Sequence, residues 1–194
     1  ITTQGATRIY KMESNYATHM VTLSLKNNSY LEFIPEQIIP YKDSRFYQKT
    51  NLDIDDSSTA VYSETIVPGR IAMGEMFDFD VCYLKTEGSL NQKIQFRDSS
   101  LLMPKSQKIQ SLAMFDDKTI LTSVYVLTKK HVTKINNLIN EMFSNIQGIL
   151  GGSSILPNDL GVSIRILGNS SEEQKTTIYQ ILKIIRKEIL PDYL

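Results

Sequence analysis

Most of the first 130 residues alternate between apolar and polar positions, which is the period of a half-buried β-strand. The stretch ATHMVTLSL at 17–25 is the clearest case, and one of its faces carries His19 among apolar side chains. Val, Ile, Thr and Tyr are frequent in the other alternating runs, in keeping with strand propensities. We therefore predict short strands at 17–25, 30–35, 46–54, 58–67, 79–86, 93–98 and 119–127, with residues 87–89 (EGS) as a hairpin turn.

Two segments nearer the C-terminus change to the period of an α-helix. Apolar residues recur at intervals of three and four between 132 and 147, and again between 172 and 190. Ser171 followed by Gln174 has the pattern of a capping box at the start of the second helix. Residues 162–167, between the helices, predict a further strand. The sequence thus predicts a single mainly β domain, a layered β-sandwich or β-helix-like stack, with two α-helices in the C-terminal third.

The charges of the 194-residue chain balance, because Lys and Arg number 21 and Asp and Glu also number 21. A neutral chain lacks the broad basic surface of nucleic-acid-binding proteins, so we expect no nucleic acid partner. No apolar run has the length of a membrane span, so we expect no membrane partner. A single cysteine, Cys82, excludes an internal disulfide and a cysteine-based zinc cluster, and fits a reducing, cytoplasmic location.

The stretch SETIVPGRIAMGEMFDFD at 63–80 raises the question of a phosphate-binding loop, because Gly69 and Gly74 have the G-x-x-x-x-G spacing. Such a loop continues with Lys and then Ser or Thr, which contact phosphate and magnesium. Here the next residues are Glu75 and Met76, and a carboxylate in this position repels phosphate. We conclude that the spacing is a coincidence and that the chain has no nucleotide site of this type.

Three interpretations of the same stretch remain. Glu64 and Glu75 flank a turn at Pro68 and Gly69, so they are candidates for the paired carboxylates of a glycoside hydrolase, although the chain has no Trp for a sugar platform. Alternatively, Arg70 organises the two glutamates into a structural or transport site. Carboxylates without His or Cys bind a transition metal weakly, which suits the transfer of an ion. A buried pair of Glu64 and Arg70 that stabilises the fold is a third possibility.

Several motifs, in the same order along the chain, resemble those of one known family. SETIVPGRIAMGEMF is similar to the S-E-x-x-x-P-G-R-x-x-x-G-E-x-F signature of the UreD/UreH urease accessory proteins. TTQGATRIYKM at 2–12 resembles that family's T-T-Q segment, with Arg8 in place of its usual lysine, and 30–48 resembles its L-E-Y-x-P region. The segment SSILPNDLGVSIRILGNSSEE and the helix containing Arg186 resemble the family's closing strand and helix.

This resemblance implies a scaffold rather than an enzyme. Family members join a helical accessory protein (UreF) and a GTPase (UreG), dock onto apo-urease and deliver nickel to it, with no tightly bound cofactor. The resemblance also implies that 1–194 is one domain without the family's N-terminal β portion. A β-rich protein-binding scaffold of another family and a carbohydrate-active hydrolase remain as alternatives. The residues predicted for a transient nickel path are Glu64, Glu75, Glu32 and Asp80, and those predicted for structure or interfaces are Arg70, Gly69, Gly74 and Pro68.

Overall fold

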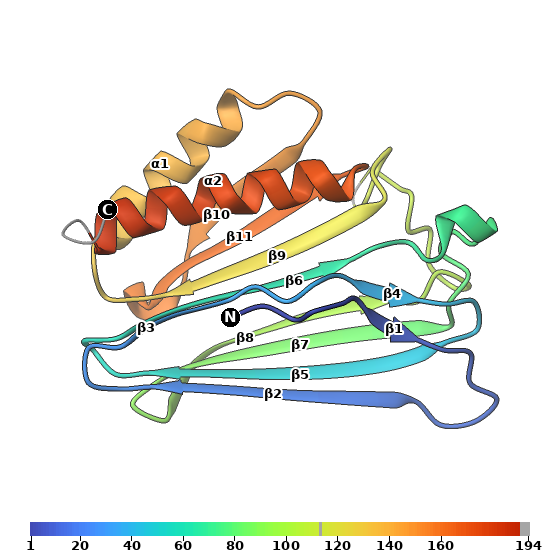
Figure 1. Ribbon diagram of the computed structural model, residues 1–194, viewed down its shortest axis with the longest axis horizontal. Helices are drawn as coiled ribbons and strands as arrows, with labels where there is room; N and C mark the ends of the chain where they lie inside the picture. The colour runs from blue at the N-terminus through green and yellow to red at the C-terminus, as the bar shows by residue number, and fades with distance from the viewer. Residues whose placement is uncertain (113, 191–194) are drawn as a thin grey trace.

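The structure is a computed structural model that describes residues 1–112 and 114–190. In this part of the chain, two β-sheets lie face to face and two helices cover the outer face of one of them (Figure 1). The first sheet has the order β1 (Thr7–Ile9), β4 (Ile38–Pro40), β6 (Thr59–Ile66), β9 (Ile120–Leu127), β11 (Gly161–Gly168), β10 (Leu150–Ile155), and β3 (Tyr30–Phe33) also pairs with β6. The second sheet has the order β2 (Ala17–Leu25), β5 (Arg45–Ile54), β7 (Val81–Leu90), β8 (Lys93–Leu102).

The helices α1 (Val132–Ser144) and α2 (Ser171–Ile189) lie side by side on the first sheet (Figure 1). Two short 3-10 helices, η1 (Ile71–Met73) and η2 (Pro157–Asp159), lie in connections between strands. The predicted layered, mainly β architecture with two helices in the C-terminal third is therefore confirmed. The apolar stripes of both helices pack on the sheet, as their period indicates.

Alternate residues of the first sheet point into two different cores. Val61 of β6 and Val124 of β9 face the helices, where they pack with Ile135 of α1. Tyr62, the next residue on β6, faces the second sheet and packs near Leu52 of β5. Because β6 is covered on both faces, it is buried at every position. Even-numbered residues of β6 therefore lie inside the sandwich, and this parity decides where Glu64 lies.

The structure corrects several local predictions. Residues 87–89 lie inside β7, and the chain instead reverses at Asn91 and Gln92, whose φ angles of 50° and 66° suit a tight hairpin turn. The first helix ends at Ser144 instead of 147. The N-cap of α2 is Ser170, whose hydroxyl accepts a hydrogen bond from the backbone N–H of Glu173 (3.3 Å), so the predicted cap is displaced by one residue.

One side of β6 is only partly covered by neighbouring strands. β3 pairs with residues 59–62 of β6, and β4 pairs with β6 at Ile66, so 63–65 have no ladder partner on that side among the described residues. The connection 34–37 turns away there and is held by the N-terminal segment instead. Ile34 donates its N–H to the carbonyl of Ile1 (3.0 Å), and Glu36 donates its N–H to Oγ1 of Thr3 (2.9 Å). This interruption is an opening in the first sheet beside Glu64.

Candidate functional site

Glu64 lies between the two sheets and only 3% of its surface is exposed. Its Oε2 atom accepts hydrogen bonds from Nε2 of Gln48 (3.0 Å) and from the hydroxyl of Tyr62 (3.2 Å). Gln48 comes from β5 in the opposite sheet, where it has the inward parity of an alternating strand. Within the described residues no Lys, Arg or His forms an ion pair with Glu64. The side chains that donate hydrogen bonds to it are thus neutral.

The hydrogen bonds of Glu64 extend in two directions. Tyr62 also accepts from Oγ1 of Thr50 (3.2 Å) and from Nε2 of Gln48 (3.0 Å). The other end of the Gln48 amide, Oε1, lies 2.9 Å from Nδ1 of His19. His19 belongs to the edge strand β2 and is exposed. A continuous polar chain therefore connects an exposed imidazole with the buried carboxylate.

Burial dominates the titration of this site. It raises the pKa of the Glu64 carboxyl from 4.5 to about 7, against the opposing effect of its hydrogen bonds and of the nearby Arg165 charge. Burial also raises the pKa of the Cys82 thiol, and the Glu64 charge adds to that rise. Cys82 is fully buried, as its place in an apolar run predicts. Near neutral pH, Glu64 is consequently a carboxyl that releases or takes up a proton readily.

A cavity of about 80 Å³ lies beside Glu64 inside the sandwich, and a groove of about 580 Å³ lies on the helix side of the same sheet. Pro35, Glu36 and Thr65 line both spaces. These residues border the opening where β6 has no neighbouring strand. The groove and the cavity therefore meet across one layer of residues at the interruption of the first sheet.

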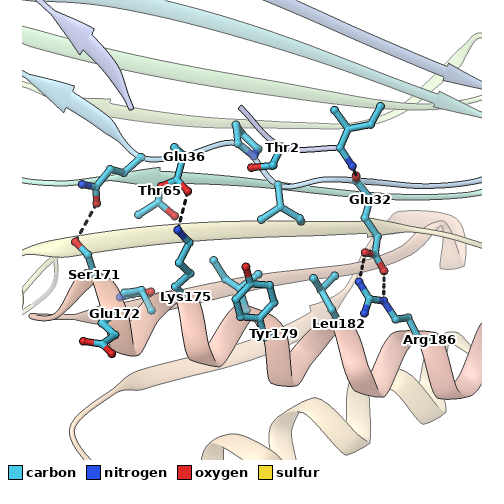
Figure 2. A pocket seen from close by; sticks show the side chains of 16 residues that line it. Thr2, Glu32, Glu36, Thr65, Ser171, Glu172, Lys175, Tyr179, Leu182 and Arg186 are labelled. Atoms are coloured by element: carbon cyan, nitrogen blue, oxygen red, sulfur yellow. Dashed lines mark hydrogen bonds and ion pairs between the residues drawn. The ribbon is translucent and has the colours of Figure 1, made fainter. Parts of the chain in front are cut away.

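Ion pairs between α2 and the segment 32–37 bridge the groove (Figure 2). Arg186 holds both carboxylate oxygens of Glu32, with 2.7 Å between its Nε and Oε1. About three turns closer to the start of the helix, Nζ of Lys175 lies 2.6 Å from Oε1 of Glu36. Figure 2 shows both pairs reaching across from the helix, with Tyr179 between them. The Lys175–Glu36 pair stands at the place where the groove adjoins the cavity.

A second set of polar side chains lies inside the sandwich, on the side of Glu64 away from the opening. Register sets Glu64 opposite Ser123 of β9, and Ser123 opposite Arg165 of β11. Arg165 forms an ion pair with Asp98 of β8 and donates to the hydroxyl of Tyr125 (3.2 Å). Its Nη1 atom is buried without a hydrogen-bond partner among the described residues. Polar groups thus follow one row across the inner face of the first sheet.

The corner formed by Arg70 and Glu75 is separate from Glu64. Nε of Arg70 donates to Oε2 of Glu75 (2.8 Å), and the guanidinium lies 4.0 Å from the ring centroid of Tyr41. Hydrogen bonding to Arg70 lowers the pKa of Glu75. The turn residues Gly69 and Gly74 have φ angles of 139° and 76°. These backbone conformations favour glycine by themselves, so the two glycines need no phosphate-binding role. Arg70 therefore contacts Glu75 but not Glu64.

The remaining predicted carboxylates are also ion-paired. Asp80 accepts from Nε of Arg45 (2.8 Å) and from Nζ of Lys105 (2.5 Å), which lower its pKa. Glu32 is held by Arg186 as described above. Within the described residues, no three side chains of His, Cys, Asp or Glu gather into a metal-binding group. The four candidates for a nickel path therefore lie at four separate places, and Glu64 is the one of them that forms no ion pair within residues 1–112 and 114–190.

Some residues of the site were not predicted from the sequence. Gln48, Tyr62 and His19 surround Glu64, and Glu36 with Lys175 borders the opening. The sequence did contain a signal for Gln48 and Tyr62, because these residues place polar atoms on the otherwise apolar faces of two predicted strands. The pairing of those strands across the sandwich was not visible in a pattern of period two.

Taken together, the fold and the site define a layered β-protein with helices on one face and, among the described residues, a buried carboxylate without an ion pair in its interior. The profile of the family described as UreD urease accessory protein matches residues 1–192. The chain therefore belongs to the UreD urease accessory protein family, as the motifs of its sequence predict. Among the described residues, neither helix is long and apolar enough to cross a membrane.

Relatives from distant organisms agree with this assignment. The urease accessory protein UreD of Cenarchaeum symbiosum is 36% identical over 191 residues, which are 97% of this chain and 67% of that protein. UreD 2 of Brucella canis is 34% identical over 193 residues, or 97% of this chain and 64% of the relative. The Yersinia enterocolitica UreD is 33% identical, with 98% and 62% covered. The chain thus spans about two thirds of the length of these relatives.

Proposed function

We propose that this chain is a urease maturation factor, a non-catalytic scaffold that acts in the cytoplasm. With a helical accessory protein of the UreF type and a GTPase of the UreG type, it delivers nickel to the active site of apo-urease. The observation that carries this proposal is the family match over residues 1–192. A separate GTPase is consistent with the sequence 69–76, which has two glycines but no phosphate-binding lysine.

Nickel is cargo in this proposal, and its path crosses the first sheet at the opening beside Glu64. The groove and the cavity share Pro35, Glu36 and Thr65, which supports a route between them. The cavity of about 80 Å³ exceeds the roughly 10–15 Å³ that one water needs, so it has room for a hydrated ion's ligands. Oxygen ligands alone hold a divalent transition metal weakly, which favours passage over storage.

Glu64 is the acidic residue that we assign to this path first. A cation that approaches it favours the ionised carboxylate and so displaces the proton that burial retains. Glu32, Glu75 and Asp80 already have cationic partners, so nickel would have to displace Arg or Lys from each of them. A hydrolase has no comparable support, because Glu64 and Glu75 line different hollows instead of one cleft.

Complementation of a urease that lacks this subunit tests the proposal. The apo-enzyme and the other accessory proteins are produced with this chain, with Glu64→Gln or with Glu188→Gln. Glu188 is a matched control, because its side chain is also buried (7% exposed) but is paired with Lys134 on the helical layer. We expect the wild type and the control to restore urease activity and nickel content. Glu64→Gln should restore neither while it still co-purifies with its partners.

Two contrary outcomes separate the parts of this proposal. Full activity with Glu64→Gln would exclude the path through Glu64 but not the maturation role. No activity with the wild-type chain would leave two explanations, a missing segment or a wrong function. Repeating the assay with the chain extended by the additional sequence of a relative distinguishes them, because only the first explanation predicts recovery.

A further inference from the structure

The loop between β6 and β7 exposes large apolar side chains, and the nickel path makes no use of it. Figure 1 shows its short helix η1, in green, beyond the ends of the strands. Met73 is 71% exposed and Ile71 is 53% exposed, and Met76 next to them is exposed as well. Large apolar patches on a protein surface mark contacts with other molecules, and these three exposed side chains come from one stretch of six residues, 71–76.

This loop is held in one conformation by contacts on both of its sides. The Arg70–Glu75 pair closes it across five residues, and Oε2 of Glu75 also accepts from the N–H of Lys42 (3.2 Å). The N–H of Phe77 donates to the carbonyl of Pro68 (2.7 Å), and its ring packs edge-on against Phe115. The exposed side chains therefore project from a pre-organised loop, which lowers the entropy lost on binding.

A hollow of about 470 Å³ adjoins the loop and contains unbalanced positive charge. Tyr10, largely exposed, meets Tyr41 in an edge-to-face contact of 5.1 Å, and these rings form part of its wall. Its two carboxylates are occupied, since Glu75 pairs with Arg70 and Asp43 pairs with Lys105. Lys11 and Lys42 also line it, and neither has an ion-pair partner in the part of the chain that the structure describes.

We propose that η1 and this hollow form a docking platform for one segment of a partner protein, an apolar segment flanked by Asp or Glu. Its apolar side chains pack on Ile71 and Met73, and its carboxylates lie against Lys11 and Lys42. Charge complementarity selects the acidic flanks, and methionine, tyrosine and arginine together are the residues that protein interfaces favour. The inference rests on the proposed function, because the partner is taken to be a member of the urease maturation complex.

Binding assays with purified components test the platform. Wild type, Ile71→Ser and Met73→Ser are measured against the UreF-type protein, the UreG-type protein and apo-urease. Leu150→Ser is the matched control, because Leu150 on the edge strand β10 is 52% exposed, like Ile71. We expect Met73→Ser to weaken the binding of one partner by about tenfold or more, and the control to change nothing. Melting curves confirm that all variants are folded.

A double variant tests the contribution of the two lysines of the platform. Lys11→Glu combined with Lys42→Glu should weaken the same partner and remove most of the salt dependence of its binding. Lys183→Glu combined with Lys187→Glu, at exposed positions of α2, is the control for the same change of net charge. Since Cys82 is fully buried, Met73→Cys supplies an accessible thiol for an environment-sensitive dye. Its emission should shift when that partner is added, whereas a dye on Leu150→Cys should not respond.

The possible results distinguish this inference from the proposed function. If the wild type binds its partners and the platform variants bind equally well, the platform is wrong and the maturation role stands. If the wild type, also when extended to the length of a relative, binds none of the three proteins, both proposals fail. Binding of anionic phospholipid vesicles that depends on Met73 and the two lysines would replace the partner protein with a membrane surface.

Discussion

Replacing Glu64 with glutamine tests whether the carboxylate is buried at a cost to stability. Glutamine has the shape of glutamate and retains one oxygen to accept from Gln48 and Tyr62. The change therefore removes an ionisable group from between the two sheets and leaves the packing in place. Any pH dependence that separates the two proteins reports the titration of this one side chain.

The magnitude follows from the pKa of Glu64, which burial raises from 4.5 to about 7. The difference, 7 − 4.5, is 2.5 pKa units, and at about 1.36 kcal/mol per unit it corresponds to about 3 kcal/mol. Between these pKa values the folded chain keeps a proton that the unfolded chain has released. Raising the pH through this window therefore lowers the free energy of unfolding of the wild type.

Urea unfolding at several pH values between about 5 and 8 measures this effect. At the acidic end wild type and Glu64→Gln should have similar stabilities, because the glutamate is neutral there. At the alkaline end the variant should be the more stable protein, by up to about 3 kcal/mol, or roughly 1–3 M in the urea midpoint. Other titrating groups are common to both proteins and cancel in the difference.

A stability difference that stays constant across this pH range would refute the reasoning, because Glu64 would then not titrate near neutrality. A variant less stable than the wild type at alkaline pH would also refute it, since the charge would be stabilised where it lies. The expected higher stability of Glu64→Gln also helps to interpret the complementation assay. A variant that is more stable but inactive in nickel delivery cannot owe its inactivity to unfolding.

Three further changes have expected outcomes. Gly161→Ala should destabilise the protein by about 3 kcal/mol or more, which lowers the melting temperature by roughly 6–12 °C. The reason is that φ at Gly161 is +142° and an added Cβ would lie 1.8 Å from the carbonyl oxygen of Val126. Calorimetry measures the change, with Gly5→Ala as the control because nothing lies near an added Cβ there. Arg186→Ala should cost about 1–2 kcal/mol in urea unfolding, since Glu32 loses a two-point contact at a half-exposed arginine, and Arg186→Lys should recover part of it. Cys82 should stay unreactive towards a thiol reagent in the native protein and react in denaturant, and a fast native reaction would contradict its burial.

The strands and helices were predictable where their apolar side chains recur with the period of a half-buried strand or of an amphipathic helix. Residues 17–25 were predicted as a strand with the bounds of β2, and α2 was predicted within one residue at each end. The strand β10 was missed because LGGSSI has no apolar alternation. Its place is secured by α1, where the side chain of Asn140 pairs with both backbone groups of Ser153 (2.8 and 3.1 Å). Such a contact between distant residues leaves no periodic signal.

The predicted turn at 87–89 failed for a related reason. Gly88 was interpreted as a turn residue, but in β7 it makes room for the ring of Phe96 on the neighbouring strand, which an added Cβ would approach to 1.9 Å. The ladder partner of a glycine decides between the two roles, and the sequence does not reveal that partner. A turn and a close approach both select glycine.

The candidate site was predictable in its parts but not in its arrangement. Glu75 and Arg70 are five residues apart, and a turn with two glycines brings them together as predicted. Glu64 precedes the same turn, and its neighbour Gln48 comes from the other sheet. Strand parity turns Glu64 inward and away from the corner of Arg70. The pairing of two sheets is a property of the whole fold, so local spacing cannot give it.

Glu64 differs from the other carboxylates of the protein in a way that favours a functional role. Buried Glu87 is held by Lys49, Lys85 and Arg97, and half-buried Glu32 is held by Arg186. A purely structural carboxylate at the position of Glu64 would be expected to have such a partner, or to be replaced by an apolar residue, because an unpaired buried charge is unfavourable. Burial instead raises the pKa of Glu64 to about 7, at an interruption of the first sheet. A buried carboxyl with such a shifted pKa is typical of a functional site, and its ready exchange of a proton is in keeping with the proposed passage of a cation.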